Sequence, residues 1–183
     1  MAKAFSEKER SEIRERILET ALDLFHDKGT KTLSIKELTT RVGIAQGSFY
    51  HFWESKEALV LDLMFYRSAQ KLSELEERFD DSMEEPAEFL AGILYEQLMD
   101  LVGKMESKKI YSDAFKLIVE RNEGLPEGLL NQYRSFLDKL VRYWKDNFVV
   151  KDVDEQALLN VFVGSFVLCM NVRQFDRAYF RQV

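Results

Sequence analysis

Apolar residues recur along most of this 183-residue chain at the three- and four-residue spacing of amphipathic helices. Only two prolines and eight glycines interrupt the pattern, so we expect an all-α fold. Residues 1–8 precede the pattern and are expected to form a loose arm. The spacing predicts helices over residues 9–28, 34–42, 45–52, 56–79, 86–105, 108–121, 129–148 and 155–179.

The stretch from Ser34 to Lys56 has the pattern of two short helices joined by a tight turn. Ser34 is a good N-cap for the first helix, and Gly43 can end it because a positive φ is cheap for glycine. The following segment, residues 45–52, places Phe49 and Phe52 inward and small or polar residues outward. This is the helix-turn-helix pattern, in which the second helix enters the major groove of DNA.

Residues 9–59 resemble the DNA-binding region of the tetracycline-repressor (TetR) family of bacterial regulators. Ala45 departs from the family pattern where a capping serine is common, and Glu54 departs where proline is common. The resemblance implies a helix-turn-helix domain over residues 1–56, joined by a long helix to a helical ligand-binding and dimerisation domain over residues 57–183. The matching positions are Ile17, Ala21, Leu24, Phe25, Gly29, Ser34, Ile35, Leu38, Val42, Gly43, Ile44, Gly47, Tyr50, Trp53, Lys56, Glu57 and Leu59.

The expected DNA-binding residues follow from the helix-turn-helix geometry and the resemblance together. Ser34 and Lys56 lie at helix N-termini, the second with Ser55 as its expected N-cap, and backbone N–H groups there favour a phosphate. Gln46 can bond an adenine edge, and Gly47 lets the backbone approach the DNA. Tyr50 bonds a phosphate in this family, and the alternative is a core aromatic with a solvated hydroxyl. The full set is Ser34, Ala45, Gln46, Gly47, Ser48, Tyr50, His51 and Lys56.

The net charge of −6 is unusual for a DNA-binding protein, but the distribution of charge matters more than the sum. Residues 28–56 hold five basic and two acidic side chains, which leaves +3 on the helix-turn-helix. We interpret this as a modest basic face, although a solvated surface would look the same. Cys169, the one cysteine, excludes an internal disulfide, and the charged N-terminus is not a signal peptide, so we expect a cytoplasmic protein.

The last predicted helix is apolar nearly all round between Ala157 and Val172. These residues are fewer than the roughly 20 that span a bilayer, so no membrane segment is expected. A helix that is apolar all round is buried all round, and a second subunit can supply part of that burial. We therefore expect residues 129–148 and 155–177 to pair with their copies as a four-helix bundle in a homodimer, where the family also dimerises.

The resemblance further implies a small-molecule site in the C-terminal half. Soft and aromatic side chains there suit a small apolar or aromatic ligand, although each of them is also an ordinary core residue. No cofactor and no metal are expected, because two histidines and one cysteine are widely spaced. The expected ligand-binding residues are Tyr95, Met99, Tyr111, Phe115, Phe162, Phe166 and Met170.

These patterns favour a homodimeric transcriptional regulator over an enzyme. Nucleophile–base pairs, glycine-rich phosphate loops and paired carboxylates at a catalytic spacing are not recognisable in the sequence. The expected protein is a repressor that binds a palindromic double-stranded operator and is released by its ligand. The alternative is a DNA-binding regulator without a small-molecule ligand, in which the C-terminal half serves only dimerisation or partner docking.

Overall fold

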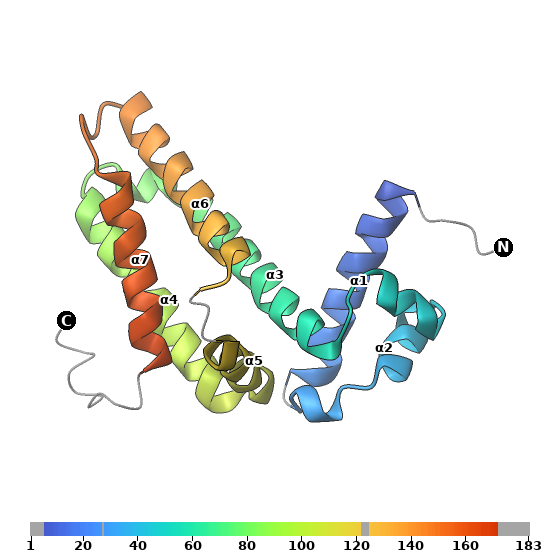
Figure 1. Cartoon of the computed structure of the whole chain (residues 1–183). Helices are drawn as coiled ribbons and strands as arrows, with labels where there is room; N and C mark the ends of the chain where they lie inside the picture. The colour runs from blue at the N-terminus through green and yellow to red at the C-terminus, as the bar shows by residue number, and fades with distance from the viewer. Residues whose placement is uncertain (1–5, 27, 122–124, 172–183) are drawn as a thin grey trace. The chain divides into compact units, whose positions relative to one another are not determined.

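The computed structural model describes residues 6–26, 28–121 and 125–171, and every regular element in these ranges is helical (Figure 1). This confirms the all-α prediction. None of these helices combines the length and apolarity needed to cross a lipid bilayer. The elements are α1 (Glu7–Phe25), η1 (Thr30–Thr32), α2 (Ile35–Val42), η2 (Gln46–His51), α3 (Lys56–Glu76), η3 (Phe79–Ser82), α4 (Pro86–Ser107), α5 (Lys109–Arg121), α6 (Glu127–Asp146) and α7 (Glu155–Met170), where η marks a 3₁₀ helix.

The chain divides into two compact units. The first comprises Met1–Tyr66 and Met105–Glu120, and the second comprises Arg67–Lys104 and Arg121–Val183. The first unit therefore extends beyond the predicted domain of residues 1–56 and also takes in most of α5. Helix α3 begins in the first unit and ends in the second.

Helix α1 begins at Glu7, two residues earlier than predicted, because Ser6 and Glu9 form a capping box. The Ser6 hydroxyl accepts the Glu9 N–H at 3.2 Å, and the Glu9 carboxylate accepts the Ser6 N–H at 2.8 Å. The expectation of a loose arm is therefore wrong for residues 6–8, whereas residues 1–5 lie outside the described ranges. The helix buries Ile17, Leu18, Ala21 and Phe25 in the core of the first unit.

Helix α5 packs on the corner that follows α1. The Asp113 carboxylate accepts the backbone N–H of Thr30 at 2.9 Å and its hydroxyl at 2.8 Å. Lys109, one helical turn earlier, pairs with the same carboxylate. The Tyr111 ring meets the edge of His26, the residue that caps the C-terminus of α1, with centroids 5.8 Å apart. These contacts make α5 part of the first unit.

The second unit is built on an aromatic core shared by α3, η3, α4, α6 and α7. Phe136 lies at its centre, with ring centroids 5.6 Å from Phe79 and 6.3 Å from Phe162. Residues 80–85, which separate two predicted helices, are partly helical because η3 extends to Ser82. Ser82 is buried in the core, where its hydroxyl accepts the Trp144 indole N–H at 2.7 Å. This bond satisfies the indole N–H, which is the one polar group of the fully buried Trp144 side chain.

Helix α7 buries only one side within the single chain. Phe162 and Cys169 are buried, whereas Val161, Val167 and Leu168 are 51%, 42% and 43% exposed. A helix that the sequence pattern predicts to be buried all round is therefore half covered. Residues 172–177 of the predicted dimerisation helix lie outside the described ranges.

Candidate nucleic-acid interface

Helix α2 has the capped and terminated form that the sequence predicts. The Ser34 hydroxyl accepts the Glu37 N–H at 3.2 Å at the N-terminus. At the other end Gly43 adopts the left-handed conformation with φ 80°, and its N–H bonds the Thr39 carbonyl at 2.9 Å. A residue with a Cβ is strained in this conformation, so Gly43 fixes the direction in which the chain leaves α2.

The predicted second helix of the motif is a 3₁₀ helix, η2, rather than an α-helix. The Ser48 N–H bonds the Ala45 carbonyl at 2.9 Å, and the Phe52 N–H bonds the Phe49 carbonyl at 2.9 Å, which are three-residue steps. Ala45 occupies the N-cap position with an extended backbone and has no side-chain oxygen to cap the segment. Short segments with few internal bonds commonly adopt this tighter helix.

Two buried aromatic side chains, one in η2 and one just after it, anchor this segment in the core. Phe49 is fully buried and Trp53 is 6% exposed, with their ring centroids 5.6 Å apart. On the flank, the Arg10 guanidinium donates to the His51 carbonyl at 2.8 Å and lies 5.7 Å from the centre of the Phe52 ring. The segment that follows the turn is thus held on two sides.

Asp62 of α3 fixes this anchor. One of its carboxylate oxygens accepts the Trp53 indole N–H at 2.8 Å, and Arg14 of α1 donates to both oxygens at 2.6 Å. Arg16 extends the same frame by donating to the Val42 carbonyl at the end of α2. Sequence reasoning missed these residues because the partners lie on different helices, and spacing along one helix cannot pair them.

The outward face of η2 carries most of the predicted DNA-binding residues. Ala45, Gln46, Gly47, Tyr50 and His51 are exposed, and Ser48 is half-buried. Tyr50 is 56% exposed, with its ring edge against Phe49 at a centroid distance of 5.3 Å, so it is not a core aromatic. A Cβ placed on Gly47 would meet no atom within 4 Å, so this side of η2 is open.

The other two predicted residues, Ser34 and Lys56, are half-buried at the N-termini of α2 and α3. Ser55 caps α3 as expected, since its hydroxyl accepts the Ala58 N–H at 3.0 Å. The Lys56 ammonium donates to the Leu33 carbonyl, which ties the start of α3 to the start of α2. An ammonium has three donors, so this bond leaves capacity for a phosphate.

The helix-turn-helix region exposes more basic than acidic side chains. Four basic side chains of the helix-turn-helix region are exposed, whereas the arginines of the supporting frame bond carbonyls and Asp62. The exposed residues are therefore the ones available to meet a polyanion. They are Lys28, Lys31, Lys36 and Arg41.

The predicted ligand-binding residues are distributed over both units. Tyr111 and Phe115 are buried in the first unit, on α5, whereas Phe162 and Phe166 are buried in the second, on α7. Tyr95 and Met99 lie on α4 and are 50% and 39% exposed. The side chain of Met170 lies outside what the structure describes.

The described residues contain no group of three or more His, Cys, Asp or Glu side chains that could hold a metal ion. Cys169 is a buried free thiol whose Sγ lies 3.8 Å from the Leu98 carbonyl. Burial raises the pKa of this thiol to about 11, which keeps it protonated near neutral pH.

Comparison with known proteins identifies the N-terminal part. Residues 17–63 match the family model described as bacterial regulatory proteins, tetR family. The HTH-type transcriptional regulator YerO of Bacillus subtilis is 26% identical over 151 residues, which cover 72% of this chain and 50% of that protein. The HTH-type transcriptional repressor KstR2 of Mycolicibacterium smegmatis is 29% identical over 110 residues, which cover 56% of this chain and 50% of that protein. The chain thus spans about half the length of these relatives.

Solved structures share the fold over nearly the whole chain. A TetR-family transcriptional regulator from Pectobacterium atrosepticum superposes with a TM-score of 0.65 at 18% identity, covering 97% of this chain and 91% of that one. A second structure, solved to explain control of antibiotic production by bacterial hormones, has a TM-score of 0.52 at 20% identity and covers 86% of this chain and 82% of that one. At these identities the likeness establishes the fold.

Proposed function

We propose that this chain, whose residues 17–63 match the tetR family model, is a transcriptional regulator that acts as a homodimeric repressor of a palindromic operator. The observation that carries the proposal is the η2 face. Gln46, Gly47, Tyr50 and His51 are exposed there, while Phe49 and Trp53 fix the segment from beneath. Exposed polar groups on a rigid frame are what base and phosphate contacts require.

The proposed dimer joins α6 and α7 to their copies. Four apolar or small residues repeat along α7 at spacings of three and four and are exposed in the single chain: Ala157, Val161, Gly164 and Leu168. A stripe of this spacing is the seam along which helices pack in bundles. Two copies of η2 would then read two half-sites, and the relative named a repressor, KstR2, supports the direction of regulation.

A small molecule bound in the C-terminal part is proposed to release the DNA by moving α3, which carries Lys56 at its N-terminus and continues into the second unit. Phe162, which lies 5.7 Å from the Tyr133 ring between centroids, is the predicted ligand residue most closely embedded in the aromatic core of that unit. Release from 99% to 1% bound requires about 5.5 kcal/mol of differential affinity between the two states.

Operator binding tests the proposal. A DNA site is first selected from a random pool with the wild-type protein, and affinity is then measured by fluorescence anisotropy. Tyr50→Phe and Lys56→Ala should each weaken binding by about tenfold, equivalent to about 1.4 kcal/mol, because each removes one bond to a phosphate. Lys56→Ala should also reduce the slope of log K against log salt by about 0.9.

The matched controls are Tyr95→Phe and Lys151→Ala, which change an exposed tyrosine and an exposed lysine of the second unit. Both should bind the selected site like the wild type. If Tyr50→Phe and Lys56→Ala bind like these controls, the proposed contacts are incorrect. If no DNA is enriched by the wild-type protein, the proposal of an operator-binding repressor fails.

A further inference from the structure

We propose that the ligand of the second unit is an organic anion, whose carboxylate or phosphate is bound between α3 and α4 by Arg67, Lys71 and Lys104. The inference rests on the proposed function, because it assigns a chemical class to the ligand of that regulator. It also changes the expectation of a purely apolar or aromatic ligand, since it adds a charged group to an apolar body.

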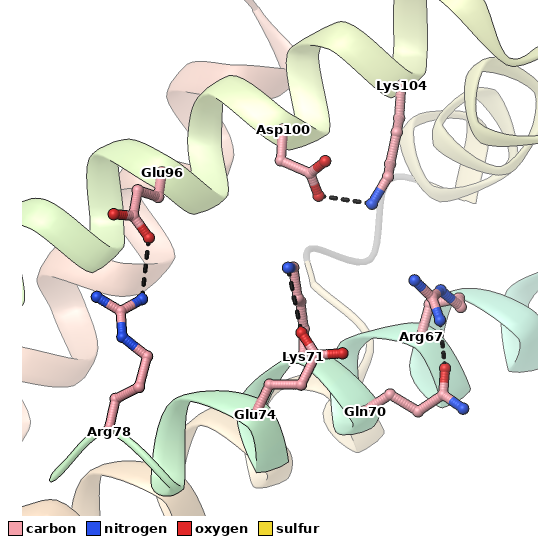
Figure 2. Close-up of polar contacts among 8 residues, drawn as sticks. All are labelled: Arg67, Gln70, Lys71, Glu74, Arg78, Glu96, Asp100 and Lys104. Atoms are coloured by element: carbon pink, nitrogen blue, oxygen red, sulfur yellow. Dashed lines mark hydrogen bonds and ion pairs between the residues drawn. The ribbon is translucent and has the colours of Figure 1, made fainter.

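Two charged stripes run along the facing sides of α3 and α4 (Figure 2). Along α3 and the turn that follows it, the basic and acidic residues Arg67, Lys71, Glu74 and Arg78 repeat at spacings of three and four residues. On α4 the stripe consists of residues 96, 100 and 104, which are Glu96, Asp100 and Lys104. Helical spacing places each stripe on one face, so each helix presents ionised groups on the side that faces the other (Figure 2).

The two ends of this polar interface differ in how their charges are paired. At one end the Arg78 guanidinium bridges the helices by an ion pair of 3.1 Å with Glu96. At the other end each lysine pairs with a carboxylate of its own helix, Lys71 with Glu74 at 3.2 Å and Lys104 with Asp100 at 2.6 Å. The bridged end holds the helices together, whereas the basic end brings cations from both helices toward one space (Figure 2).

Arg67 is the group at the basic end that is best suited to a ligand. Its side chain is half-buried, and its guanidinium donates to the neutral amide oxygen of Gln70. Within the described part of the chain it is paired with no carboxylate. A half-buried guanidinium normally finds an anionic partner, and its planar fork matches a carboxylate or a phosphate by two parallel bonds.

Facing like charges also favour an anion. Arg67, Lys71 and Lys104 contribute three positive charges, against the carboxylates of Glu74 and Asp100. A monoanion from solution would neutralise the remaining charge and bond groups from both helices at once. The exposed fractions of the Lys71 and Lys104 side chains, 38% and 25%, leave both ammonium groups within reach while reducing their hydration.

Apolar residues next to the cations indicate that the ligand also has an apolar part. Tyr133 packs against the apolar core of the second unit, and its ring is 5.7 Å from Phe162 between centroids. Leu72, the neighbour of Lys71, is a buried member of the same core. The cations therefore stand at the edge of an aromatic and aliphatic cluster, which suits an anion with an apolar tail.

A charge series of matched probes tests the proposal on the full chain without DNA. Binding of decanoate, decyl phosphate and decanol is measured by isothermal titration calorimetry at constant ionic strength. At least one of the two anions should bind at least tenfold more tightly than decanol, and the tighter anion identifies the headgroup as carboxylate or phosphate. Arg67→Gln should remove this preference for charge, and Lys104→Gln should reduce it.

The control is Arg134→Gln on α6, because Arg134 is exposed and lies 3.9 Å from Glu127 without belonging to either stripe. It should keep the wild-type preference. The proposal is overturned if decanol binds as tightly as both anions, if neither anion binds, or if Arg67→Gln and Lys104→Gln both keep the preference. Operator binding by the ligand-free protein is measured separately, so a failure here leaves the DNA-binding proposal standing.

Discussion

Each tryptophan of this protein is buried and gives its indole N–H to a single side-chain oxygen. Trp53 bonds Asp62 at 2.8 Å in the first unit, and Trp144 bonds Ser82 at 2.7 Å in the second. Loss of the acceptor of a buried donor costs about 1–3 kcal/mol of folding stability. Each hydrogen bond therefore satisfies the indole N–H and also holds the ring in place. In the first unit this determines where η2 lies.

Asp62→Ala should lower the free energy of unfolding by about 1–3 kcal/mol, because it leaves the Trp53 N–H without its acceptor and Arg14 without its ion-pair partner. Asp62→Asn should cost less, since an amide oxygen can still accept from the indole. Urea unfolding measures both. Equal losses for the two variants would contradict the importance assigned to the indole bond.

Asp113 should make the first unit sensitive to acid. Burial alone would raise the pKa of Asp113, but hydrogen bonds from Lys109 and Thr30 hold it below its usual value. A lowered folded-state pKa adds stability that is complete above about pH 4 and is lost as pH falls through the folded-state pKa. In Asp113→Asn the urea midpoint should therefore fall less between pH 5 and pH 2.5 than in the wild type, and parallel curves would refute this role.

At this scale, sequence reasoning succeeded where partners are close in the chain. The caps Ser34 and Ser55 act within three residues, and both were predicted. Asp62 and Asp113 act on residues 48 and 83 positions away, and neither was found. Side-chain pairing across helices depends on the packed arrangement, which periodicity in one helix does not contain.

Among the elements, η1 and η2 show two different uses of glycine. Gly29, before η1, has φ 77° and ψ −178°, a conformation nearly restricted to glycine, and a Cβ there would lie 2.4 Å from Lys109 Cγ. Gly47, in η2, has open space around the same position. The fold requires glycine at position 29, whereas Gly47 leaves open space on the surface of η2.

The two alanine variants should therefore separate stability from DNA binding. Gly29→Ala should lower the free energy of unfolding by at least about 1 kcal/mol, because of backbone strain and the contact with α5. Gly47→Ala should unfold like the wild type but bind the selected operator more weakly, since its methyl group occupies the space of the DNA backbone. Unchanged affinity of Gly47→Ala would show that η2 does not approach the DNA at this residue.

Helix existence was largely predictable from apolar spacing, and helix type was less so. The start of α1 was misplaced because the capping box at Ser6 lies in a charged segment without apolar residues. The 3₁₀ form of η2 was missed because six residues are too few for spacing to distinguish two kinds of helix. Residues 172–179 of the predicted last helix lie outside the described ranges.

For the whole molecule, the half-covered α7 gives a test of the proposed dimer. Val161→Glu should convert the protein to a monomer at micromolar concentration, because it places a charge in the apolar seam, while its 51% exposure leaves the fold of the single chain intact. Analytical ultracentrifugation measures the change. The control is Val119→Glu on α5, which alters a residue of similar exposure, 57%, outside the seam.

If Val161→Glu sediments like the wild type, α7 is not the dimer seam. If both valine variants dissociate, the effect does not identify the seam. The candidate DNA-binding face was more predictable than the dimer or the ligand site, because the helix-turn-helix is a local pattern contained in Ser34–Lys56. The other two depend on surfaces assembled from several helices.

The two tryptophans also provide a built-in optical readout. Trp53→Phe leaves tryptophan emission only from Trp144, and Trp144→Phe leaves it only from Trp53, so each variant reports on one unit. Denaturation curves from the pair would reveal whether the first unit unfolds together with the second or before it. A red shift confined to Trp144 after addition of an effector would locate its first action without any label.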